Sequence, residues 1–184
     1  MIVLLTQAEI IEKVGSAAAE TFAGLYEEYL PRVYRYISYR ITDVPTAEDL
    51  TSTVFEKALT KFRSYNPEKA AFSTWIFSIA RNTLTDYFRV SRRRQTVQLD
   101  DLAAAVPAGS PEDESDRNEE IRMLNICLAR LSGPEQEIIS LKFGAEMTNR
   151  QIARELALTE SNVAVIVYRA VRKLRDSFRG SKDG

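Results

Sequence analysis

The amino-acid sequence predicts an all-α protein with two small helical domains and an acidic linker between them. Apolar residues recur at three- and four-residue spacing through most of the chain, between short turn-forming stretches. Charge is uneven: residues 20–95 carry 12 Lys and Arg against 9 Asp and Glu, residues 96–120 carry 1 against 8, and residues 121–184 carry 11 against 7. The predicted parts are a lead-in (1–19), a first domain (20–95), a flexible acidic linker (96–119) and a second domain (120–184).

The composition excludes several classes of site. The chain has no histidine and a single cysteine, Cys127, so an intrachain disulfide, a His/Cys zinc site and a Ser-His-Asp or Cys-His catalytic group are all excluded. We therefore expect no enzyme, no metal and no cofactor, with Cys127 as a small apolar core residue. The apolar start Met1–Leu5 is too short for a signal peptide and lacks basic residues, so we expect a cytoplasmic protein without a membrane span.

The first domain opens with a helical pattern from Phe22, in which apolar and aromatic residues recur. Pro31 either kinks this helix or lies in the first turn of a second one. Proline disfavours helical backbone at the residue before it, so Pro45 predicts a break at Val44. Thr46 is then expected to start the next helix, which a polar loop follows.

A two-faced helix is predicted over residues 72–89, with Ser73 as its cap. Its apolar stripe consists of Ile76, Ala80, Leu84 and Phe88. Its polar face consists of Ser78, Arg81, Asn82, Thr85 and Arg89, with Trp75 at the upstream end. Aromatic rings stack on unpaired bases, Asn reads base edges and Arg neutralises phosphate, so this face fits single-stranded nucleic acid. The alternative is an ordinary amphipathic helix with Trp75 in the core.

The basic cluster Arg92–Arg94 follows this helix. It is either a solvated helix end or a contact to a phosphate backbone. The linker has two interpretations as well. It is a plain tether, or its acids lie in a basic channel of a partner in place of nucleic acid.

The second domain begins with a helical pattern from Ile121 to Leu131. The stretch Ser132 to Glu135 then predicts the end of one helix and the start of the next, because Pro134 suits a first helical position and acids suit a first turn. This helix is expected to end at Gly144 as its C-cap.

The last part of the chain has the pattern of a helix-turn-helix. A short helix opens at Thr148–Gln151, a turn falls at Ala157–Leu158, and Thr159 is a good N-cap for a second helix that runs to about Phe178. The residues expected outside on the second helix are Ser161, Asn162, Ala164, Val165, Tyr168, Arg169 and Arg172. In such motifs the start of the second helix enters the major groove and cations hold phosphates. The alternative is a plain helical hairpin with a basic face.

Several of these stretches resemble bacterial RNA polymerase sigma factors of the extracytoplasmic-function type. Residues 47–59 resemble their second conserved region, FSTWIFSIARNT at 72–83 resembles their promoter-melting region, and residues 131–175 are similar to their fourth region. The similarity covers about residues 22–90 and 120–177. It implies a two-domain initiation factor that binds core RNA polymerase and promoter DNA and is not itself a catalyst.

The resemblance also implies roles for particular residues. The helix that contains Asp49 would dock on the coiled coil of the polymerase clamp, and the acidic linker would thread the polymerase cleft. The expected core-polymerase contacts are Asp49, Leu50, Thr53, Glu56 and Lys57. The loop 63–72 would capture a base flipped from the −10 element, and the expected −10 residues are Arg63, Ser64, Tyr65, Asn66, Lys69, Phe72, Trp75, Ser78, Arg81, Asn82 and Arg89. The expected −35 residues are the seven outside residues of the last helix together with Arg150.

The sequence departs from the family pattern at Ala164, Val165 and Ile166, where polar or basic residues are common. These apolar side chains would make few hydrogen bonds to base edges, and contacts to thymine methyl groups or recognition of DNA shape could replace them. The exposed apolar strip also predicts a protein partner that covers it at rest. The resemblance implies that this partner is an anti-sigma factor, which commonly holds members of the family inactive. Two other classes remain open: a helix-turn-helix regulator that acts on duplex DNA without polymerase, and a helical adaptor that binds no DNA.

Overall fold

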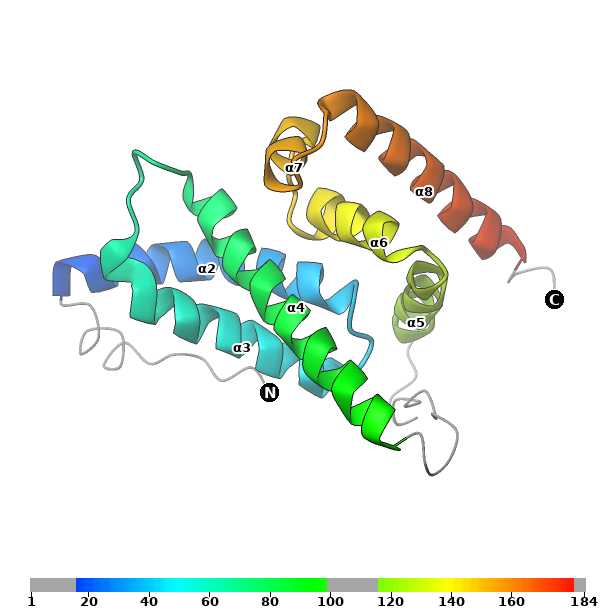
Figure 1. The fold of residues 1–184 in the computed structure, drawn as a ribbon, viewed down its shortest axis with the longest axis horizontal. Helices are drawn as coiled ribbons and strands as arrows, with labels where there is room; N and C mark the ends of the chain where they lie inside the picture. Colours follow the sequence, from blue (N-terminus) through cyan, green and yellow to red (C-terminus); the bar gives the residue numbers. More distant parts are fainter. Residues whose placement is uncertain (1–15, 99–115, 181–184) are drawn as a thin grey trace. The chain divides into compact units, whose positions relative to one another are not determined.

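The computed structural model describes residues 16–98 and 116–180, and every regular element in these two ranges is a helix (Figure 1). The predicted all-helical fold is confirmed. By its internal contacts the chain divides into two units; among the described residues the first takes 16–31 and 43–98, and the second takes 32–42 and 116–180. Residues 32–42 belong to the predicted first domain (20–95) but group with the second unit. The domain boundaries inferred from the sequence therefore stay a prediction.

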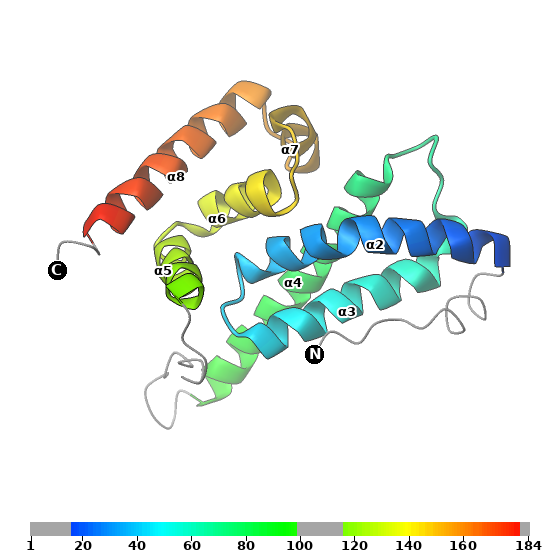
Figure 2. The same cartoon turned by 180° about the vertical axis from the view of Figure 1, so that it is seen from behind.

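Three helices build the first unit: the N-terminal part of α2 (Ser16–Ser38), α3 (Val44–Lys61) and α4 (Phe72–Gln98). The helices α3 and α4 pack against each other (Figure 1 and Figure 2). Edge-on aromatic pairs attach α2 to both, with Tyr26 and Phe55 at 4.6 Å and Tyr29 and Phe72 at 5.0 Å between ring centroids. The fully buried side chains of this core include Phe22, Phe55, Leu59, Ile76, Phe77 and Leu84.

Two helix boundaries in this unit differ from the prediction. Helix α3 begins at Val44, not at Thr46, because the carboxylate of Asp43 accepts a hydrogen bond of 2.9 Å from the backbone N–H of Thr46. Hydrogen bonding to the Thr46 side chain and this bond from its backbone N–H lower the pKa of the Asp43 carboxyl. Pro45 lies in the first turn, where its missing N–H has no cost. The break expected over residues 42–45 is therefore present only up to Asp43, and Val44 is already helical.

Helix α4 departs from expectation in its cap and at its C-terminal end. It begins at Phe72 as predicted, but the expected cap Ser73 is a buried second residue of the helix. It continues past Arg89 to Gln98, so the cluster Arg92–Arg94 lies within its last turns, where the side chain of Arg93 is exposed. Pro31 likewise lies inside α2, which is one helix. Most of the predicted linker and lead-in falls outside the described residues.

The second unit contains α5 (Asp116–Ala129), α6 (Gly133–Ile139), the π-helical turn η2 (Ser140–Gly144), α7 (Asn149–Glu155) and α8 (Glu160–Gly180). Its core cluster consists of Leu128, Leu131, Ile139 and Ala170, with Leu124, Val171 and Leu174 packed against it. Cys127 is fully buried with a free thiol, as expected of a small core residue.

The new helix predicted after Ser132 is confirmed, since Ser132 and Glu135 form a capping box at the start of α6. Lys173 on α8 donates a hydrogen bond of 2.7 Å to Glu135 and so joins α8 to the start of α6. This ammonium, with the backbone N–H of Ser132, lowers the pKa of Glu135 to about 2. The expected C-cap at Gly144 was wrong: Gly144 lies inside η2, and the positive φ of 56° falls on Glu146.

Candidate nucleic-acid interface

The loop before α4 is closed by a cluster of four aromatic rings. Tyr65 lies 5.0 Å from Trp75 and 5.6 Å from Phe72 between ring centroids, and Phe62 lies 6.1 Å from Tyr65. Phe72 is buried and Trp75 is half-buried, so Trp75 packs against the cluster and still reaches the surface. Its stacking on unpaired bases stays a prediction.

Hydrogen bonds fix the backbone of this loop. The Tyr65 hydroxyl donates to the carbonyl of Ala70 at 3.1 Å, and the Asn66 side chain accepts from the backbone N–H of Glu68 at 2.8 Å. Burial raises the pKa of Tyr65, with Tyr29 adding to the shift. The loop is therefore held in shape while its cations Arg63 and Lys69 remain exposed.

The polar face of α4 continues from this loop. Asn82 and Arg89 are exposed, Ser78 and Arg81 are half-buried, and the apolar stripe lies on the opposite side in the core. The Ser78 hydroxyl donates to the Trp75 carbonyl at 2.7 Å, so Ser78 holds the helix more than it offers a donor to a ligand. The cluster, the loop and this face together form one surface with ring edges, an amide and guanidinium groups.

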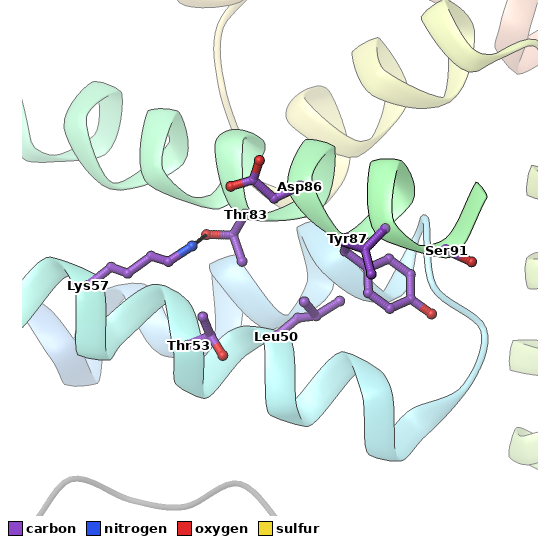
Figure 3. A pocket seen from close by; sticks show the side chains of 8 residues that line it. Leu50, Thr53, Lys57, Thr83, Asp86, Tyr87 and Ser91 are labelled. Atoms are coloured by element: carbon purple, nitrogen blue, oxygen red, sulfur yellow. Dashed lines mark hydrogen bonds between the residues drawn. The ribbon is translucent and has the colours of Figure 1, made fainter. Parts of the chain in front are cut away.

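A groove between α3 and α4 brings together three residues expected to contact the polymerase. It has a volume of about 380 Å³, and its lining consists of Leu50, Thr53, Lys57, Thr83, Asp86, Tyr87, Val90 and Ser91. Figure 3 shows Leu50 and Thr53 on α3 opposite Tyr87 on α4, and Lys57 donating to the Thr83 hydroxyl at 3.1 Å. Asp49 and Glu56 are exposed on α3 but do not line the groove.

The α4 wall of this groove was missed by the sequence analysis. Thr83, Tyr87 and Ser91 recur every four residues, so they share one face of α4 that is neither the apolar stripe nor the predicted polar face. That spacing could have indicated a third face on this helix.

The helix-turn-helix is built as its sequence indicates. Thr148 and Gln151 form a capping box at the start of α7, with the N–H of Gln151 bonded to the Thr148 hydroxyl at 3.3 Å. The turn places Ala157 at a φ of 53°, and Thr159 caps α8 by accepting a bond of 3.1 Å from the N–H of Asn162. The expected turn and cap are confirmed, and α8 runs to Gly180, slightly beyond the expected end.

The outward face of α8 has the exposure that its spacing predicts. All seven residues expected outside are exposed, with Tyr168 at 68% and Val165 at 45%, while Val163 and Ala170 are fully buried. Arg150 at the start of α7 is exposed and lies 3.5 Å from Glu160. The second unit thus presents one helix face of short polar, apolar and guanidinium side chains.

Comparison with known proteins covers both units. Residues 25–94 match the family Sigma-70 region 2, and residues 127–176 match Sigma-70, region 4. The ECF RNA polymerase sigma factor BldN of Streptomyces coelicolor is 34% identical over 167 residues, which are 90% of this chain and 63% of that protein. The chain belongs to the ECF sigma factors.

Other ECF sigma factors match over nearly their whole length. SigM of Bacillus subtilis is 26% identical over 164 residues, which are 89% of this chain and 99% of that protein. Among solved structures, the sigma factor RpoE in complex with the anti-sigma factor NepR from Bartonella quintana has a TM-score of 0.68 at 20% identity and covers 87% of this chain and 98% of its own. This last likeness supports the fold alone.

The loop, the α4 face and the groove of this ECF sigma factor fall within the region 2 match, and the outward face of α8 falls within the region 4 match. Among residues 16–98 and 116–180 no group of three His, Cys, Asp or Glu side chains could hold a metal ion. No helix in that part of the chain is long and apolar enough to cross a membrane.

Proposed function

We propose that this ECF sigma factor binds core RNA polymerase and directs transcription from promoters whose −10 element it melts and whose −35 element it reads. The observation that carries the proposal is the presence of two different nucleic-acid surfaces. The first unit offers aromatic rings, an amide and cations, which suit unpaired bases, and the second offers a capped helix face, which suits a duplex groove.

The polymerase contact is assigned to α3. Asp49 and Glu56 are exposed charges on this helix, and Leu50 and Lys57 line the groove beside them. An apolar groove with a polar rim is the usual form of a protein-binding surface, and a helix of the polymerase clamp is the proposed occupant. The region 2 match over residues 25–94 supports this assignment.

The −10 contact is assigned to the loop 63–72 and the α4 face. Flipping a base costs free energy of unstacking, so the pocket that receives it must be formed beforehand. Phe72 is only 6% exposed, and we therefore assign it to support of the loop through its contact with Tyr65 rather than to stacking. Arg63, Lys69 and Asn82 are the exposed side chains available to phosphates and base edges.

The −35 contact is assigned to α8, whose N-terminal turns would lie in the major groove. Arg150, Arg169 and Arg172 are exposed and would bind flanking phosphates. Asn162 is the exposed amide nearest the start of the helix, where side chains of this motif reach base edges.

We further propose that an anti-sigma factor holds the chain inactive. The exposed apolar side chains Val165 and Tyr168 are what a protein partner would cover at rest. The structurally similar RpoE of Bartonella quintana was solved with the anti-sigma factor NepR. The proposed role is regulatory and not catalytic, and a factor that acts on polymerase and chromosome would work in the cytoplasm.

Run-off transcription tests the proposal. Purified full chain is mixed with bacterial core polymerase, without another sigma factor, on a library of promoter fragments. We expect specific transcripts, and Asp49→Ala or Asn82→Ala to reduce them at least tenfold, whereas Thr60→Ala, an exposed change on the same helix as Asp49, leaves them unchanged. A chain that retains duplex DNA but neither binds core polymerase nor starts transcription would show the proposal to be wrong.

A further inference from the structure

The face of α8 assigned to the major groove contains an apolar patch in its second turn. We define this patch as Ala164, Val165 and Tyr168, all of which are exposed. It lies between polar residues of the first turn and the exposed cations Arg169 and Arg172. Since residues three and four apart lie on one helix face, these groups form one continuous surface.

The cap of α8 fixes where this patch begins. The Thr159 hydroxyl accepts the N–H of Asn162, so the first turn is held and the side chain of Asn162 projects one turn before the patch. In a groove-bound helix, base edges that face Asn162 meet a hydrogen-bonding amide, whereas those facing Ala164 and Val165 meet only methyl groups. Ala164 and Val165 therefore cannot distinguish bases by hydrogen bonds.

One feature of the major groove matches methyl groups: the 5-methyl of thymine. The surrounding charge favours DNA over an apolar protein as the functional occupant, since Arg169 and Arg172 flank the patch. The nearest acid of the helix, Glu160, lies 3.5 Å from Arg150, and so its charge is offset. A small apolar surface with guanidinium groups on its C-terminal side fits thymine methyls beside a phosphate backbone.

We propose that Ala164 and Val165 select thymine in the −35 element through contact with its 5-methyl group, with Tyr168 packing beside them. This inference rests on the proposed function, because it needs α8 to lie in the major groove. It assigns part of the sequence specificity to loss of water from methyl groups rather than to hydrogen bonds. The −35 element of this factor therefore contains one or two thymines opposite the patch.

Deoxyuridine provides the test, because it lacks the methyl group and keeps every hydrogen-bonding atom of thymine. The full chain with core polymerase is bound to a promoter enriched by run-off selection, and each −35 thymine is replaced in turn by deoxyuridine. Burying one methyl group corresponds to about a fourfold change in affinity. We expect one or two thymines to show this loss and the others to show none.

A double-mutant cycle assigns the effect to the patch. Val165→Ala keeps the helix and removes the methyl groups, so it should weaken binding of the thymine promoter about fourfold and of the deoxyuridine promoter little. Val44→Ala is the matched control, since Val44 is an exposed valine of α3 outside the assigned surfaces, and it should keep the full preference for thymine.

The outcomes separate this inference from the proposed function. If all deoxyuridine promoters bind as well as the thymine promoter while Arg169→Ala weakens binding, α8 lies on DNA but the methyl readout is wrong. If deoxyuridine weakens binding equally with wild type and Val165→Ala, Val165 does not read the methyl and the proposed readout by Ala164 and Val165 together is wrong. If no promoter is bound or transcribed at all, the proposed function itself has failed.

Discussion

The hydroxyl of Tyr65 is expected to hold the −10 loop in its base-capturing shape. Tyr65→Phe removes one oxygen, which donates to the Ala70 carbonyl at 3.1 Å across the loop. The ring is kept, and with it the contacts at 5.0 Å to Trp75 and 5.6 Å to Phe72. Any change in behaviour is then due to loop closure rather than to the aromatic core.

A partly buried neutral hydrogen bond contributes about 1 kcal/mol net. Its loss would lower the equilibrium for loop closure by about fivefold. If single-stranded DNA binds only the closed loop, affinity for an unpaired −10 strand should fall by a factor of up to about five. Affinity for the −35 duplex should not change, because that contact belongs to the other unit.

The assay is binding of the full chain with core polymerase to a fluorescent fork probe, which has an unpaired −10 strand, and to a −35 duplex. Tyr65→Phe should weaken only the first. Equal affinity of variant and wild type for the fork would refute the assignment of the loop, and an equal loss on both probes would show a global defect instead. Thermal unfolding of both proteins controls for folding.

Three further predictions concern the second unit. Glu135→Gln should lower the stability of this unit at pH 7 by only about 1 kcal/mol, because Lys173 is largely exposed and the ion pair is screened by solvent. The pKa of Glu135 is lowered to about 2, so the stability that the pair gives the wild type is complete above pH 4.5 and is lost as the pH falls through 2. Thermal unfolding measured against pH would show this loss. Cys127 is fully buried, so a thiol reagent should label it only when the chain unfolds, and rapid labelling of the native chain would contradict the packing. Thr159→Ala should cost about 1 kcal/mol of helix stability and weaken binding to the −35 duplex. Thr159→Ser keeps a capping hydroxyl, so it should keep the stability and the binding of the wild type, and duplex titration would measure the binding.

The helix-turn-helix was predictable because its information is local. The cap at Thr159 and the turn at Ala157 depend on residues a few positions away, and the exposure of Tyr168 follows from helical period. The two-faced character of α4 and its start at Phe72 were predictable for the same reason, although its end at Gln98 was not.

Two helix ends could not be predicted because neighbouring residues favoured different local structures. Pro45 argued for a break, yet it occupies a first turn because Asp43 supplies the cap one residue before Val44. Gly144 looked like a C-cap, but it is the last residue of the π-helical turn η2; the cap is Ala145 and the left-handed residue is Glu146. Single-residue preferences could not decide either case.

The groove between α3 and α4 depended on tertiary packing. Lys57 was expected on the α3 surface, but nothing in the sequence indicated that it would bond to Thr83 on the next helix. The aromatic cluster is a similar case. Tyr65 and Trp75 are ten residues apart and belong to different helical patterns, so only the folded loop brings them together.

The central claim is that this ECF sigma factor separates promoter strands, and permanganate oxidation of unpaired thymines tests it most directly. With core polymerase, the full chain should make −10 thymines reactive on a selected promoter, and Asn82→Ala should reduce that reactivity. Core polymerase or the chain alone should leave them unreactive. If the −35 duplex is protected while the −10 thymines stay unreactive, the chain binds duplex DNA only and the account is wrong.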